Sequence, residues 1–155
     1  MKNILYIILI SFFSLTIISC SSDNKEEFLT TTSTDDETAG FTVSSISGNT
    51  TEAGGTATFT VKLSSQPTAN VTIGVSSSDT SEGTVSPSLL TFTSANWNAN
   101  QTVTVTGVND SLDDGNQSYT VVLAAASSSD SGYSGMNPTD VSVTNTDDET
   151  EGFTV

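Results

Sequence analysis

The sequence predicts an all-β protein in which two sheets pack face to face, and three observations lead to this fold class. Between residues 39 and 149, short segments alternate apolar and polar side chains, which is typical of half-buried strands. The segments are separated by turns rich in Gly, Pro, Asn and Ser, and none of this region has the period of a helix. The composition is rich in Thr, Val and Phe, which favour strands, and 155 residues suffice for one domain of ordinary size.

Seven strands are expected, with residues 56–63 as the clearest, because apolar side chains there alternate strictly with Thr and Lys. Residues 50–55, with Gly54 and Gly55, are expected to turn the chain, and residues 77–88 to form a longer loop. The strands are expected at residues 40–46, 56–63, 70–76, 88–93, 101–108, 118–125 and 139–145. Seven short strands joined by turns indicate an Ig-like Greek-key β-sandwich.

The same alternation predicts the core. The inward side chains should be Phe41, Val43, Ala57, Phe59, Val61, Leu63, Val71, Ile73, Val75, Leu90, Phe92, Val103, Val105, Tyr119, Val121, Leu123, Val141 and Val143. Trp97 is expected to pack against the core or a loop, because isolated aromatic side chains normally pack.

One segment occurs twice. Residues 32–43 and 144–155 match at ten of twelve positions, and both contain Asp-Asp-Glu-Thr followed by Gly-Phe-Thr-Val. We interpret the segment as a repeat boundary, with the repeat at residues 39–149 and the truncated, mobile start of a second repeat at residues 150–155.

The charge composition excludes several functions. The chain has three Lys, no Arg and no His against eighteen Asp and Glu. Nucleic acid is therefore not an expected partner, because neutralising phosphates needs Lys and Arg. Catalysis by a Ser-His-Asp or Cys-His arrangement and zinc binding through His are excluded as well.

The N-terminus predicts export. Residues 1–19 combine a short cationic start with a 15-residue, mostly apolar run from Ile4 to Ile18, which is short for a membrane span and fits a helical signal peptide. Ile17-Ile18-Ser19-Cys20 resembles the bacterial lipobox, which implies acylation of Cys20; the alternative is an ordinary signal peptide with a chance cysteine. Residues 20–38 would then be the acylated cysteine and a flexible, disordered tether. Ser21 to Glu27 is similar to surface-export signals of bacterial lipoproteins, so we expect a surface-exposed outer-membrane lipoprotein held to the membrane by its lipid anchor.

The acidic residues gather in a few loops. In a seven-strand sandwich, the first, third and fifth loops and the exit from the last strand lie at one end. They carry ten carboxylates, namely Glu52, Asp79, Glu82, Asp110, Asp113, Asp114, Asp147, Asp148, Glu149 and Glu151. Like charges at about 4 Å repel by about 1 kcal/mol per pair even in water, so a cation is expected among them. Oxygen ligands from several loops suit Ca²⁺ better than Mg²⁺, and the alternative is an acidic surface that only aids solubility.

Parts of the chain resemble a known family. Glu52-Ala53-Gly54-Gly55 with the following TATFTVKL, the stretch GVNDSLDDGNQSYTVVL, and the terminal Asp-Asp-Glu are similar to Calx-β domains, the sandwich modules of sodium/calcium exchangers and of many bacterial surface proteins. Leu90–Asn98 and Val141–Asp148 resemble bacterial tandem repeats of this kind. The resemblance implies a calcium site made by Glu52, Asp110, Asp113, Asp114, Asp147 and Asp148, with Asp79 as a looser match. Asn116 and Gln117 stand where the family often has glutamates, which implies a weaker or partial site.

Two functions remain open. The leading hypothesis is a non-catalytic surface lipoprotein whose repeat is a Ca²⁺-stabilised structural or adhesive module, with other surface proteins or glycans as partners. The alternative is a carbohydrate-binding accessory module of a larger surface protein, for which Trp97, Tyr119 and Tyr133 are few and scattered. An enzyme is not expected, because the acids form one crowded patch with no apolar pocket suggested beside it.

Overall fold

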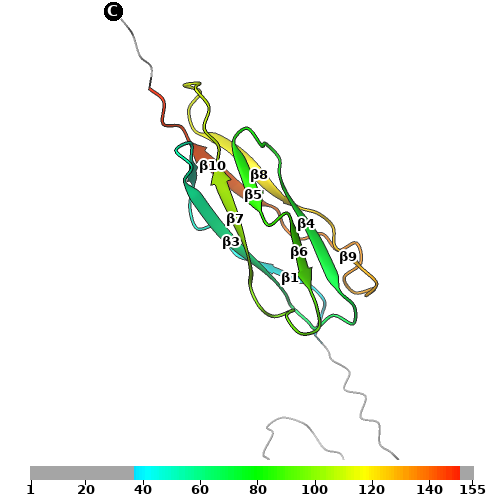
Figure 1. The fold of residues 1–155 in the computed structure, drawn as a ribbon. Coiled ribbons are helices and arrows are strands. Elements are labelled where there is room, and N and C mark those ends of the chain that lie inside the picture. Colours follow the sequence, from blue (N-terminus) through cyan, green and yellow to red (C-terminus); the bar gives the residue numbers. More distant parts are fainter. Residues whose placement is uncertain (1–36, 151–155) are drawn as a thin grey trace, which may run out of the picture. The chain divides into compact units, whose positions relative to one another are not determined.

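The computed structural model describes residues 37–150, which form ten strands in two layers (Figure 1). The strands are β1 (Phe41–Val43), β2 (Thr50–Thr51), β3 (Thr56–Leu63), β4 (Val71–Ser77), β5 (Gly83–Ser86), β6 (Leu89–Phe92), β7 (Gln101–Gly107), β8 (Gln117–Leu123), β9 (Ser127–Ser128) and β10 (Val141–Thr146). One sheet has the order β1-β3-β7-β5. The other has the order β2-β10-β8-β4-β6, with β9 paired to β4. The predicted all-β sandwich is confirmed.

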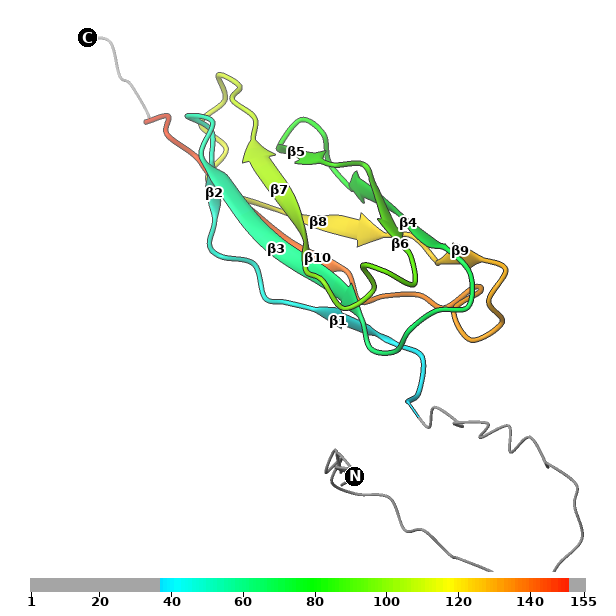
Figure 2. The same cartoon turned by 60° about the horizontal axis from the view of Figure 1, so that its bottom comes forward.

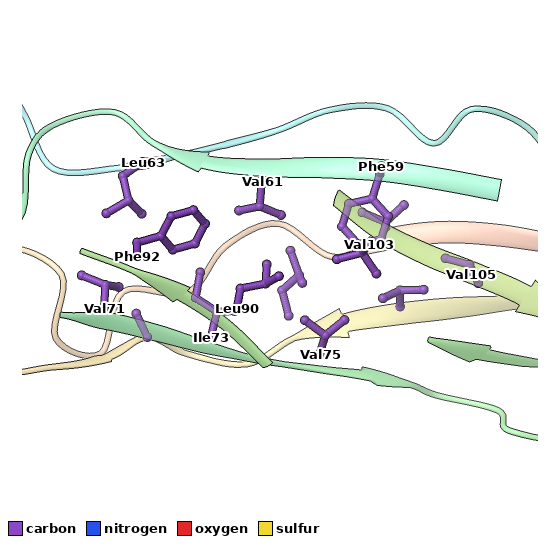
Figure 3. Close-up of a cluster of buried hydrophobic side chains, with 14 of the residues drawn as sticks. Phe59, Val61, Leu63, Val71, Ile73, Val75, Leu90, Phe92, Val103 and Val105 are labelled. Atoms are coloured by element: carbon purple, nitrogen blue, oxygen red, sulfur yellow. The ribbon is translucent and has the colours of Figure 1, made fainter. Parts of the chain in front are cut away.

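The core lies between the two sheets, and Figure 3 shows its side chains pointing into this space from both layers. Val61 from β3 faces Ile73 and Leu90 from the other sheet, and Phe59 from β3 lies near Val103; all five are almost fully buried. Strict alternation along β3 puts every second residue on the same face, so residues 56–63 form the strand that the sequence predicts. Burying a side chain such as Phe59 contributes about 1.5–3 kcal/mol.

The core prediction is confirmed, with two partial cases and two additions. Phe41 and Val43 are only partly buried, because β1 is an edge strand, although both pack against the core. Trp97 is also partly buried against the core, as predicted. Ala126 and Tyr133 join the core from the segment between β8 and β10, which the strand pattern does not cover.

The predicted first strand over residues 40–46 is shorter and is followed by a second one. β1 pairs antiparallel with β3, after which the chain crosses to the other sheet, where β2 pairs in parallel with β10. Figure 2 shows the connecting segment running along the edge of the sandwich. The turn predicted over residues 50–55 therefore begins with a short strand, because the edge of β10 offers backbone groups that Thr50 and Thr51 can pair with.

The loop predicted over residues 77–88 also contains a strand. β5 pairs antiparallel with β7, and the chain then returns to the other sheet as β6, which pairs with β4. A four-residue edge strand with one apolar side chain, Val85, has too little alternation to be recognised in the sequence.

Several predictions lie outside the described residues. They are the signal peptide at residues 1–19, acylation of Cys20, the tether as far as residue 36, and the start of a second repeat from residue 151 onward. Within residues 37–150, no helix has the length and apolar character needed to cross a bilayer.

Candidate functional site: an acidic end of the sandwich

Carboxylates from four segments meet at one end of the sandwich. Figure 1 shows the turn after β2, the β4–β5 loop, the β7–β8 loop and the exit from β10 at the same end. Two groups of three carboxylates form there, each with one oxygen per residue within 4.8 Å of the others. The first group is Glu52, Asp147 and Glu149, and the second is Glu82, Asp110 and Asp114. The prediction that acidic side chains gather at one end in groups able to hold a metal ion is therefore confirmed.

Glu52 and Glu149 face each other in the first group. The parallel pairing of β2 with β10 delivers Glu52, whose backbone N–H donates to the Thr146 carbonyl over 3.1 Å. Only 3% of Glu52 is exposed. The Glu52 carboxyl, together with burial and the charge of Asp148, raises the pKa of Glu149 to about 7.

One oxygen on each of these two side chains has no partner. Oε2 of Glu52 and Oε2 of Glu149 are both buried, and neither accepts a hydrogen bond from any of residues 37–150. A buried carboxylate oxygen without a donor costs free energy. The pair must therefore share a proton or face a cation.

Asp147 is held differently from its two neighbours. Its Oδ2 accepts the Gly115 N–H over 2.6 Å and its Oδ1 accepts the Glu149 N–H over 2.8 Å. These hydrogen bonds, led by that from Glu149, lower the pKa of Asp147 below its usual range. Asn116 Oδ1 accepts the Asp147 N–H over 3.1 Å, so the β7–β8 loop is bonded to the exit of β10. Asp147 therefore supplies a fixed negative charge beside Glu52.

Glu82 is the buried member of the second group, with 8% of its surface exposed. Burial raises the pKa of Glu82 above its usual value, and the charges of Asp114 and Asp110 add to this, while a hydrogen bond from Asn145 opposes it. Asp110 Oδ1 accepts the Leu112 N–H over 2.8 Å, which shapes the loop between β7 and β8.

Four of the seven predicted metal ligands lie in these groups, namely Glu52, Asp110, Asp114 and Asp147. Asp79, Asp113 and Asp148 are exposed and belong to neither group. Asp79 instead accepts hydrogen bonds from the Ser81 hydroxyl and N–H, which lower its pKa.

Glu82 and Glu149 are the members that the predicted ligand set lacks, although both were expected at this end. The alternation of an extended chain contains a signal for Glu149: residues 147 and 149 share one side and residue 148 points to the other. No comparable signal identifies Glu82, because its burial follows from the way the β4–β5 loop folds against Asn145.

No side chain of the described residues can neutralise this end. Lys62 is their only Lys, and they have no Arg or His. Lys62 pairs with Thr42 near the end of β3 that is remote from Glu52. A cation at the acidic end therefore has to come from outside the sandwich.

The aromatic side chains of residues 37–150 do not form a platform. Tyr119 and Tyr133 are buried, and Trp97 is partly buried against the core. A groove of about 720 Å³ runs between residues 41–46 and residues 136–142, with Phe41 as its aromatic side chain. No pair of exposed aromatics among residues 37–150 is available to stack on a sugar.

Comparison with known proteins identifies no family and finds only distant structural similarity. No protein-family model matches the chain, and no curated protein matches it. Among solved structures, the chain is similar to SSP-19, an MSP-domain protein like family member of Caenorhabditis elegans, with 11% identity and a TM-score of 0.43 over 67% of this chain and 98% of that one. It is also similar to WR4, a C. elegans MSP family member, with 13% identity and a TM-score of 0.40 over 64% of this chain and 90% of that one.

Proposed function

We propose that this chain is a non-catalytic surface lipoprotein whose sandwich is a structural or adhesive module stabilised by Ca²⁺ at its acidic end. The observation that carries the metal proposal is the pair of buried, unpartnered oxygens on Glu52 and Glu149. Acidic loops that only aid solubility would leave their carboxylates in water. Here one carboxylate is buried against another with no basic side chain nearby, which a bound cation would relieve.

The donor set fits Ca²⁺. Glu52, Asp147 and Glu149 would hold the ion, with Glu82, Asp110 and Asp114 adding negative charge close by. All six are hard oxygen donors, and they come from four segments of the chain. Ca²⁺ accepts six to eight such ligands in irregular geometry, whereas Mg²⁺ demands a near-ideal octahedron. The resemblance of the sequence to Calx-β domains supports the same ion.

The first test is thermal unfolding of residues 35–155 in metal-free buffer and in ~10 mM Ca²⁺, with NaCl matching the ionic strength. An ion that binds only the folded state at a hundredfold excess over Kd adds about 2.7 kcal/mol. For a domain of this size, the expected rise in Tm is about 10 °C. Coinciding Tm values, or an equal rise with Na⁺, would contradict the metal site.

A matched pair of variants separates a site from general charge. Glu52→Gln and Asp113→Asn each remove one negative charge from the same end, but Asp113 is exposed and lies in neither group. Glu52→Gln should abolish the Ca²⁺-dependent rise without lowering the metal-free Tm, because it also removes a facing carboxylate. Asp113→Asn should retain the rise, and equal losses in both variants would show that only overall charge matters.

The anchoring part of the proposal rests on Cys20 and the lipobox resemblance. Cys20→Ser should release the protein from the membrane fraction of a bacterial host, because acyl chains provide the expected attachment. A variant that stays in the membrane fraction as firmly as the parent would refute the lipid anchor while leaving the calcium proposal intact.

A further inference from the structure

We propose that Asn145 is a positioning residue for the cation site, and that its buried amide holds three segments of the acidic end in register. The inference rests on the proposed function, because it concerns how that site is held together. Asn145 lies on β10, is fully buried, and bonds through its side chain to β2, to Glu82 and to Val108.

The amide uses both its acceptor and its donors. Its Oδ1 accepts the Thr50 hydroxyl over 3.0 Å. Its Nδ2 donates to the Val108 carbonyl over 3.0 Å and to Glu82 Oε2 over 3.4 Å. These three partners come from β2, from the chain just after β7, and from the β4–β5 loop, which are far apart in sequence.

Two of these partners, and Asn145 itself, each lie two residues before a carboxylate of the two groups. Thr50 precedes Glu52 by two residues, and Val108 precedes Asp110 by two. Asn145 itself precedes Asp147 by two residues and is paired in the sheet with Thr50. Glu52 begins the turn after β2, and Asp110 and Asp147 follow the ends of β7 and β10, so anchoring the residue two positions before each one limits where its carboxylate can lie. A single amide therefore controls where carboxylates from three segments point and bonds directly to Glu82.

An amide suits this position where a carboxylate does not. An ionised Asp accepts hydrogen bonds only, so it would leave the Val108 carbonyl without its donor and would face Glu82 with a like charge. Space is limited as well, because a side chain on Gly107 would collide with Asn145 Oδ1 and with the Thr51 carbonyl. The buried amide thus packs against bare backbone and has little room to reorient.

The proposal predicts weaker cation binding when the amide is changed. Groups that orient metal ligands typically contribute 10–100-fold in metal affinity. Asn145→Asp should therefore weaken Ca²⁺ binding by about 10–100-fold, even though it adds a negative charge beside the site. If attraction between charges alone controlled binding, Asn145→Asp would instead bind Ca²⁺ more tightly than the parent.

The experiment is calorimetric titration of residues 35–155 with CaCl₂, together with Tm in metal-free buffer, for the parent and four variants. Asn145→Asp and Thr50→Val should weaken binding, while Thr50→Ser keeps the hydroxyl that donates to Asn145 and should bind as the parent does. The control is Tyr133→Phe, which removes a buried hydroxyl bonded to Ser65 at the opposite end. It should lower the metal-free Tm and leave the Kd unchanged.

Each outcome decides something. If Asn145→Asp binds Ca²⁺ as tightly as the parent or more tightly, or if Tyr133→Phe weakens binding equally, the positioning role is overturned. If Asn145→Asp does not fold, the comparison of Thr50→Val with Thr50→Ser decides, and equal affinities overturn the proposal. A parent protein that binds no Ca²⁺ overturns the proposed function and this inference with it, whereas binding by the parent with unaffected variants overturns this inference alone.

Discussion

The two ends of the sandwich differ in whether their buried polar groups have hydrogen-bond partners. At the end remote from the acidic groups, Tyr133 is 1% exposed and its hydroxyl bonds to the N–H, carbonyl and side chain of Ser65. Asp130 there accepts the N–H groups of Thr68 and Gly132, each over 2.8 Å, and these bonds lower its pKa. At the acidic end, Glu52 and Glu149 face each other with unpartnered oxygens.

The difference is between an end whose buried polar groups are satisfied by the chain and an end where two buried carboxylate oxygens have no donor among the described residues. Every donor and acceptor just described at the Tyr133 end is satisfied by the chain. The acidic end has carboxylates in excess of donors, so we expect its contribution to stability to depend on protons or cations in solution. The contribution of the Tyr133 end to the free energy of unfolding should therefore be independent of Ca²⁺ and of pH near neutrality. The contribution of the acidic end should depend on both.

The largest expected effect tests the complete end. Tyr133→Ala removes a fully buried aromatic side chain and should cost about 3–5 kcal/mol in the free energy of unfolding. Chemical denaturation should show the same loss in metal-free buffer and in Ca²⁺, because the change is remote from the acidic groups. A loss that differs clearly between the two buffers would show that the ends are coupled.

A smaller effect concerns pH at the acidic end. The pKa of Glu149 is raised to about 7 and that of Glu82 is also raised, so the folded state holds protons that the unfolded state releases. Stability of the metal-free protein should therefore be greatest near the ordinary glutamate pKa and fall as pH rises through about 7. Thermal unfolding from pH 5 to pH 8 measures this decline, and Ca²⁺ should reduce it by binding the ionised pair. A metal-free Tm that rises over this range would contradict the facing carboxylates, as would an unchanged slope in Glu52→Gln.

The smallest expected effect is at Asp130. Asp130→Asn leaves one acceptor oxygen for two backbone N–H groups, so about 1 kcal/mol should be lost. The loss should be equal with and without Ca²⁺, as measured by chemical denaturation. Asp113→Asn at the acidic end, which removes an exposed charge, is the comparison, and its effect on the metal-free protein should be close to zero or slightly stabilising.

Strands that depend on apolar alternation could be predicted from the sequence, and strands that depend on polar contacts could not. Residues 56–63 alternate over eight positions and form β3 with the predicted bounds. β2 is two threonines, and Thr50 is buried because it bonds to Tyr119, Asn145 and the Thr144 carbonyl, none of which hydropathy reveals. β5 likewise forms because β7 has a free edge, a property of the sheet and not of the segment itself.

The location of the candidate site could be predicted from the sequence, but the carboxylates that belong to it could not. Strand order alone brings the four acidic segments to one end, as expected. Which carboxylates face each other depends on side-chain direction within loops, so exposed Asp113 and Asp148 could not be told from half-buried Asp110 and Glu149. The alternation of residues 147 to 149 held part of this information, whereas the buried position of Glu82 depends on its contact with Asn145.

The parallel pairing of β2 with β10 also determines how the domain would bear a pulling force. The described chain comes in at one end of the sandwich and leaves at the other (Figure 1), and these two strands run side by side in the same direction. Tension along the chain would therefore load their hydrogen bonds in shear, so that the bonds stretch together and do not open one by one as in a zipper. Glu52 and Asp147 follow directly after these strands. An ion bound between these two carboxylates would reinforce the β2–β10 pair, through which tension passes from the first part of the chain to the last.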